Sequence, residues 1–397
     1  MQGANAQAPR TAYATFEATR WAASAVSVLF HVSNLSRIKD GLTGPPFGTS
    51  AMELAISALA IASVPILFSI SGFLVGARAD ASVPLMENAK ARWRRLFPLV
   101  GASALLACAT GSFRAETGGI DVRALVLWLG MGANLAVDNA RFLGNAMCSP
   151  AWAILVDLHA NVLMLYPMRR CNPTVTAWAM LACVCVSVRV AVVHHDWCVL
   201  SSPPNDTPAR DALGYAYRAI YGREPRTVTS RVVGCAHLTV QTHTSRSLHY
   251  DYFFTASRLT PFAIGATFGR IQRVGLRVPV ALSHMGAVAG AAIVVGMVAC
   301  MTELTPSRTD RLAGGLVLDV VIPVCFQIAT YAHHHRRGPR VPAVLAWVNV
   351  LHVPLLCAVW RVAHDHLCTR LALVSVASVT LGAFCERFVA PFFRRPS

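Results

Sequence analysis

The stretch TRWAASAVSVLFH, Thr19–His31, decides the fold class, because it opens an apolar segment with a charge at its edge and an ionisable ring inside it. Ten residues separate Arg20 from His31. In a helix these eleven steps rise roughly 16 Å, about half the hydrocarbon thickness of a bilayer. If Arg20 marks the membrane surface, His31 lies near the midplane, where an ionisable group is costly and indicates a functional site. The alternative is a buried histidine that bonds to a neighbouring helix.

Apolar segments of similar length recur along the whole chain. Of its 397 residues, 55% are hydrophobic and 14% are charged. This composition is typical of a polytopic membrane protein and leaves little material for a soluble domain. We therefore predict an all-α fold of about ten transmembrane helices. The predicted spans are 21–36, 51–76, 96–112, 150–167, 174–193, 252–269, 279–300, 312–332, 342–362 and 371–390.

Basic residues cluster in the connections between these segments. The formal net charge is +16, and the clusters follow every second apolar segment, as they do in cytoplasmic loops. The pattern favours contact with membrane lipids and with phosphates, and it argues against nucleic acid as a partner. Counting the spans places both termini in the cytoplasm. We expect an integral, multi-pass protein of the endomembrane system or the plasma membrane.

The segments divide the chain into a short tail and one membrane domain. Residues 1–16 are expected to form an N-terminal cytoplasmic tail, and residues 17–397 the membrane domain. The long connection 194–250 is expected on the lumenal or extracellular side and contains Cys198 and Cys235, with Cys148 and Cys368 near the same face. A disulfide among these cysteines is possible in an oxidising compartment. The segment 122–137 breaks the alternation and contains glycines, so we interpret it as re-entrant or interfacial. No cysteine spacing predicts a metal site.

Ionisable side chains inside the apolar segments are the candidate functional groups. Asp157 and Asn161 are four residues apart and share one helix face. A carboxylate beside a histidine fixes its tautomer and raises its basicity, so Asp157 is the candidate partner of His31. Arg92 and Arg95 are three residues apart, a geometry suited to phosphate oxygens. Membrane anchoring by positive charge predicts the same cluster.

The pair Ser71 and Gly72 lies near the end of the second predicted span. A glycine there lets two helix backbones approach closely, or lets the helix end unwind. A nucleophilic role for Ser71 is not expected, since no Gly-x-Ser-x-Gly elbow surrounds it.

Seven motifs, in order along the chain, resemble the acyltransferase 3 family of polytopic membrane acyltransferases. The opening stretch carries the arginine and histidine separated by ten residues, and RWRRLFPLV (92–100) carries an Arg-x-x-Arg. The other motifs are PILFSISGFLVG (65–76), SPAWAILVDLHANVLMLYP (149–167), TASRLTPFAIGATFGR (255–270), LHVPLL (351–356) and CERFVAPFFRR (385–395). The aspartate at 157 and Cys148 resemble the animal and protist branch. Pro65 stands where the family carries an acidic residue, and Asn349 or Val350 where it carries a tyrosine.

The resemblance implies transfer of an acyl group, commonly acetyl, from an acyl-CoA on the cytoplasmic side to a hydroxyl of a carbohydrate or lipid-linked acceptor. It implies no permanently bound cofactor, with acyl-CoA as the donor substrate. His31 is then the general base and Asp157 its orienting carboxylate. The residues expected to bind the phosphates of the donor are Arg20, Arg92 and Arg95. The expected substrate pocket contains Ser71, Gly72, Trp152, Arg258, His352 and Glu386.

A solute or proton-coupled transporter is the competing functional class, because intramembrane His, Asp and Arg side chains also form relays. The sequence shows no internal repeat and few acidic residues, which favours the enzyme. A structural or receptor-like membrane protein is the third class. Binding of acetyl-CoA separates the enzyme from both.

Overall fold

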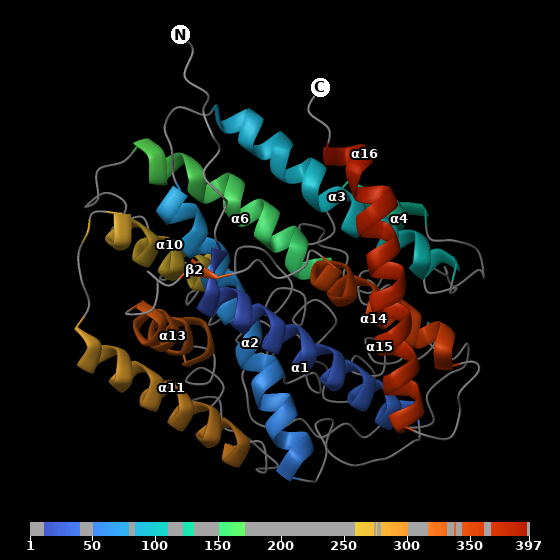
Figure 1. The fold of residues 1–397 in the computed structure, drawn as a ribbon, viewed down its shortest axis with the longest axis horizontal. Helices are drawn as coiled ribbons and strands as arrows, with labels where there is room; N and C mark the ends of the chain where they lie inside the picture. Colours follow the sequence, from blue (N-terminus) through green and yellow to red (C-terminus); the bar gives the residue numbers. More distant parts are fainter. Residues whose placement is uncertain are drawn as a thin grey trace, which may run out of the picture.

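The computed structural model describes residues 12–39, 51–78, 84–109, 122–130, 151–170, 259–273, 275, 279–300, 317–331, 337–338, 344–360 and 367–394. Within these ranges the chain is helical apart from one short strand pair (Figure 1). The helices are α1 (Ala14–Lys39), α2 (Ala51–Arg78), α3 (Leu85–Ala109), α4 (Val122–Leu129), α6 (Ala151–Arg170), α10 (Leu259–Arg273), α11 (Val280–Cys300), α13 (Ile322–Tyr331), α14 (Val344–Trp360), α15 (Leu367–Phe384) and α16 (Ala390–Arg394). Two π-helical turns, η5 (Val317–Val321) and η6 (Cys385–Val389), lead into α13 and α16.

These helices confirm the predicted all-α class. Each predicted apolar segment contains described helix, except 174–193, which lies outside the described residues together with the loop 194–250. The segment 122–137 is helical over α4, and the rest of it beyond residue 130 is not described. Among the residues that the structure describes, two helical stretches are long and apolar enough to cross a membrane by themselves, Ala55–Ala77 and Cys368–Phe393. The count of about ten spans therefore stays a prediction.

Helix α1 begins within the range expected to be a tail. It starts at Ala14, and Tyr13 and Phe16 are buried against Phe73 of α2. Just before it, β1 (Ala12–Tyr13) pairs antiparallel with β2 (Arg337–Gly338). The start of α1 thus lies beside the connection between α13 and α14, which is one of the basic clusters.

Helices α2 and α10 pack with their backbones in contact, because each carries two glycines four residues apart. A Cβ built on Gly72 or Gly76 of α2 would overlap the carbonyl oxygen of Phe262 or Ala266. A Cβ on Gly265 or Gly269 of α10 would overlap carbonyl oxygens of α2 in the same way. Small residues at this spacing allow close helix crossing in membrane proteins. This confirms the expectation that Gly72 lets two backbones approach.

A proline in α14 frees a backbone carbonyl that a side chain of α3 satisfies. Pro354 lies inside α14 and has no N–H, so the carbonyl of Val350 loses its helical donor. The Ser103 hydroxyl of α3 donates to that carbonyl at 3.4 Å. The carbonyl freed by the proline is thereby satisfied from a neighbouring helix, two residues from His352.

The contacts also give the relative directions of the helices. Along α2 and α10 the matched positions rise together, so these two helices are parallel. Helices α1 and α14 are parallel too, since Ser24 contacts Asn349 and His31 contacts His352. Helix α11 is antiparallel to α13, with Ser283 bonded to Ala329 and Gly290 facing Cys325.

Candidate active site

Helices α1 and α14 bring two imidazole rings together. Nδ1 of His31 lies 2.8 Å from Nε2 of His352, and the ring centroids are 5.0 Å apart. His352 is fully buried, whereas His31 keeps partial exposure. Nδ1 of His352 lies 3.0 Å from the carbonyl oxygen of Val348. The Ser27 hydroxyl, one turn before His31, lies 3.5 Å from Nδ1 of His31.

A second polar contact joins the same two helices nearer the start of α1. The Asn349 side-chain amide donates to the Ser24 hydroxyl at 2.6 Å, and Ser24 donates to the carbonyl of Arg20 at 2.7 Å. Ser24, Ser27 and His31 therefore form one polar stripe on the face of α1 that meets α14. This stripe fixes the register of α1 against α14 at the depth of the histidines.

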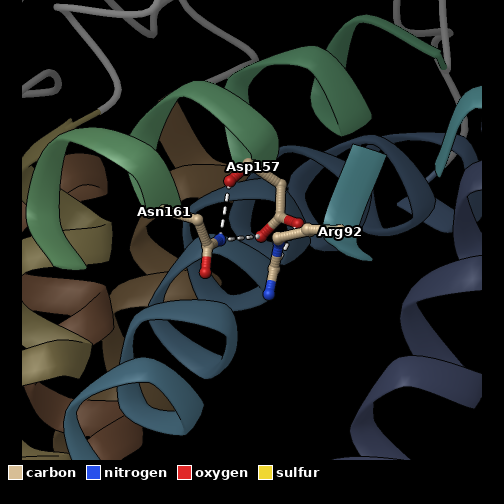
Figure 2. A network of polar contacts seen from close by, with 3 residues as sticks. All are labelled: Arg92, Asp157 and Asn161. Atoms are coloured by element: carbon tan, nitrogen blue, oxygen red, sulfur yellow. Dashed lines mark hydrogen bonds and ion pairs between the residues drawn. The ribbon is translucent and has the colours of Figure 1, made fainter. Parts of the chain in front are cut away.

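A separate cluster of charged and polar groups lies where α6 meets α3 (Figure 2). An Arg92 Nη2 of α3 donates to Asp157 Oδ2 of α6 at 2.5 Å. Asn161 Nδ2 donates to the backbone carbonyl of Asp157 at 2.6 Å and to its Oδ1 at 3.3 Å. Ser71 of α2 also bonds this carboxylate, and Arg95 is close enough for its charge to act on it. The carboxylate is thus held by groups from three helices.

This cluster corrects the expected partner of His31. Asp157 was expected to orient that ring, but its carboxylate is bonded to Arg92, Asn161 and Ser71 instead. The reason is helix packing: α6 packs against α3 and α2, whereas α1 meets α14 at the depth of His31. The ring nitrogen of His352 takes the place that the sequence assigned to the carboxylate.

A family model described as an acyltransferase domain, acyltransferase 3, matches residues 13–384. The chain belongs to the acyltransferase 3 family. It is therefore an acyltransferase, and members of this family are membrane proteins. Neither the curated proteins nor the solved structures contain a match.

Of the other predicted site residues of this acyltransferase, those that the structure describes have their contacts elsewhere than at the histidine pair. Arg20 forms an ion pair with Glu17 on its own helix at 2.9 Å, and Arg95 is exposed on α3. Trp152 is buried and packs edge-on against Phe68. The remaining two are Glu386, whose Oε2 accepts a hydrogen bond from Trp347 Nε1 at 2.9 Å, and Arg258, which lies outside the described residues.

The described cysteines and acidic groups form no metal site. Among the residues that the structure describes, no three His, Cys, Asp or Glu side chains are grouped to hold a metal ion. Cys108, Cys325, Cys368 and Cys385 are free thiols. Cys148, Cys198 and Cys235 lie outside the described ranges, so the disulfide in the long loop stays a prediction.

Sequence reasoning missed several residues that hold the site together. Ser24 and Ser27 precede His31 by seven and four residues, and this helical spacing could have marked one polar face of α1. The Ser103 hydroxyl and the Trp347 indole had no such signal. Their roles depend on which helices pack against each other, and only the tertiary structure shows this.

Proposed function

We propose that this acyltransferase moves an acetyl group from acetyl-CoA on the cytoplasmic side to a hydroxyl of a carbohydrate or lipid-linked acceptor. His31 removes the proton from the acceptor hydroxyl as its oxygen attacks the thioester carbonyl carbon. A new C–O bond forms and the C–S bond breaks. The proton then passes from His31 to the departing thiolate, so the products are the acyl ester and free CoA.

The observation that carries this proposal is the unequal exposure of the two paired imidazoles. His352 is fully buried, so it cannot reach a substrate, whereas His31 is partly exposed and has one ring nitrogen engaged by His352. A general base needs one nitrogen held and the other accessible to the reacting hydroxyl. His31 has one nitrogen held by His352 and is the more exposed of the two residues, which favours it over His352 as the base.

Arginine side chains support a CoA thioester as the donor. Such a donor carries several phosphate charges, for which guanidinium groups are well suited. Arg95 is exposed on α3, and the side chain of Arg20 is 32% exposed at the start of α1. Arg92 is largely engaged by Asp157. We therefore assign phosphate binding mainly to Arg95 and Arg20, with Arg92 holding the Asp157 cluster.

The helix directions and surfaces support a membrane setting with the predicted alternation of spans. Counted from a cytoplasmic N-terminus, the segments containing α2 and α10 run inward, and those containing α1 and α14 run outward. The parallel packing within each pair agrees with this order. Large apolar side chains are exposed along α11 and α15, as lipid contact requires.

The test is a His31→Ala variant of the full chain in membranes supplied with radiolabelled acetyl-CoA. We expect acetyl transfer into the glycans and lipids of those membranes to fall by about 100-fold or more, the usual contribution of a general base. Binding of acetyl-CoA to the purified variant should be unchanged. The matched control is His284→Ala, which removes an exposed histidine of α11 and should leave transfer unaffected.

Two outcomes would contradict the proposal. If wild-type protein neither binds acetyl-CoA nor releases CoA, the donor is wrong, and a transporter would account better for the buried ionisable groups. If His31→Ala transfers acetyl groups at the wild-type rate, the donor stands but His31 is not the base. Mass spectrometry of surface glycans and lipids with and without the protein then identifies the acceptor.

A further inference from the structure

We infer that His352 is a positioning residue: it holds His31 in the tautomer whose Nε2 is free to accept the proton of the acceptor hydroxyl. This inference rests on the proposed function and adds to it the residue that sets the chemical state of the base. It also identifies which ring nitrogen of His31 accepts the proton, and the distance between the rings alone does not determine that.

The starting point is the carbonyl oxygen of Val348. A carbonyl can only accept a hydrogen bond, so the Nδ1 of His352 that lies 3.0 Å from it carries a hydrogen. In a neutral imidazole only one ring nitrogen carries a hydrogen. Nε2 of His352 is therefore an acceptor.

The hydrogen bond between the two rings crosses the interface between α14 and α1. Nδ1 of His31 lies 2.8 Å from that acceptor nitrogen, so it is the donor of the hydrogen bond. In neutral His31 the remaining nitrogen, Nε2, then carries the lone pair. A backbone carbonyl of α14 thus determines, through His352, which nitrogen of His31 is the base.

Packing explains why His352 can hold this orientation. His352 is fully buried, and so are its chain neighbours Leu351 and Val353. Its own helix is anchored to α1 by the Asn349–Ser24 bond and to α3 by the Ser103–Val350 bond. A ring with fixed surroundings on two sides loses little further freedom when it orients His31.

The test compares two substitutions that each keep half of the ring's hydrogen bonding. The amide of glutamine reaches the position of ring Nε2, so His352→Gln can still offer an acceptor oxygen to His31. The amide of asparagine reaches only the position of Nδ1, so His352→Asn keeps the bond to Val348 and loses the bond to His31. Both are polar and neutral, and the full chain is assayed in membranes with radiolabelled acetyl-CoA.

We expect His352→Gln to keep kcat within about tenfold of wild type and His352→Asn to lose about 100-fold, the usual weight of a well-placed base. KM for acetyl-CoA should be unchanged in both. In a His31→Ala background the two substitutions should have equal and small effects, because the ring they position is gone. Thermal unfolding of each purified variant shows whether it is folded.

The inference is overturned if the folded Gln and Asn variants lose activity equally, or if the loss appears in KM. It is also overturned if the two variants still differ in the His31→Ala background. If the Asn variant does not fold, the Gln variant alone decides. A folded Gln variant that loses about 100-fold of the activity contradicts the inference, and one that retains its activity supports it. Wild-type protein without acetyl transfer would instead contradict the proposed function, so the two failures are distinguishable.

Discussion

At the residue scale, the ionisable groups of the site form two separate clusters with different proposed roles. In the histidine pair, two imidazole rings contact each other, with the Val348 carbonyl beside His352 and the Ser27 hydroxyl beside His31. The Asp157 cluster contains two opposite charges whose side chains are only 20% and 15% exposed, for Arg92 and Asp157 respectively. Removing one member of such a pair leaves the other charge partly buried without its partner, whereas removing both leaves no unpaired charge.

We therefore predict that Asp157→Asn destabilises the protein by about 2 kcal/mol, the usual weight of a hydrogen bond to a charged group. The double variant Arg92→Gln with Asp157→Asn should regain most of that stability, because no unpaired charge remains. Thermal unfolding of the purified proteins measures both effects. Equal stability of the single and double variants would show that the unpaired Arg92 charge is not what destabilises Asp157→Asn.

At the element scale, the glycine contacts between α2 and α10 decide how closely these helices approach. Ser71, one residue from Gly72, contacts the Asp157 cluster from α2. The two helices have no room for a side chain at these points, since a Cβ would overlap backbone atoms that cannot move alone. The site therefore depends on residues that do no chemistry.

We predict that Gly72→Ala destabilises the protein by about 1–3 kcal/mol through overpacking. The matched control is Gly296→Ala in α11, where nothing lies within 4 Å of the added Cβ. That control should be neutral or stabilising by up to about 1 kcal/mol, because alanine favours helix over glycine. Thermal unfolding of both variants provides the comparison, and equal effects would contradict the close packing.

At the scale of the whole molecule, the described helices present two kinds of surface. Buried faces meet in a core between α2, α3, α6 and α14, while α11 and α15 expose large apolar side chains. The basic residues of α10 lie in its last turn. In the proposed orientation that end of α10 faces the cytoplasm, together with the start of α3.

Cysteine labelling of sealed membrane vesicles tests this orientation. In a background without reactive native cysteines, Lys90→Cys and Arg273→Cys should react with a membrane-impermeant maleimide from the same side. Met52 lies at the start of α2, which the predicted spans place on the other side of the membrane. Met52→Cys should therefore react only from that side; the native residue is 70% exposed. Labelling of all three from one side would contradict the predicted spans.

The sequence by itself determined the helical class, the positions of the apolar segments and the family. These properties depend on local composition and on spacing along one helix, which is why Asn161 and Asp157 were expected on one face. Only the tertiary structure decided the partners of each ionisable group. Because α6 packs against α3 and α1 packs against α14, Asp157 meets Arg92 and His31 meets His352. Contacts between residues 65 and 321 positions apart follow from helix packing, which no local pattern encodes.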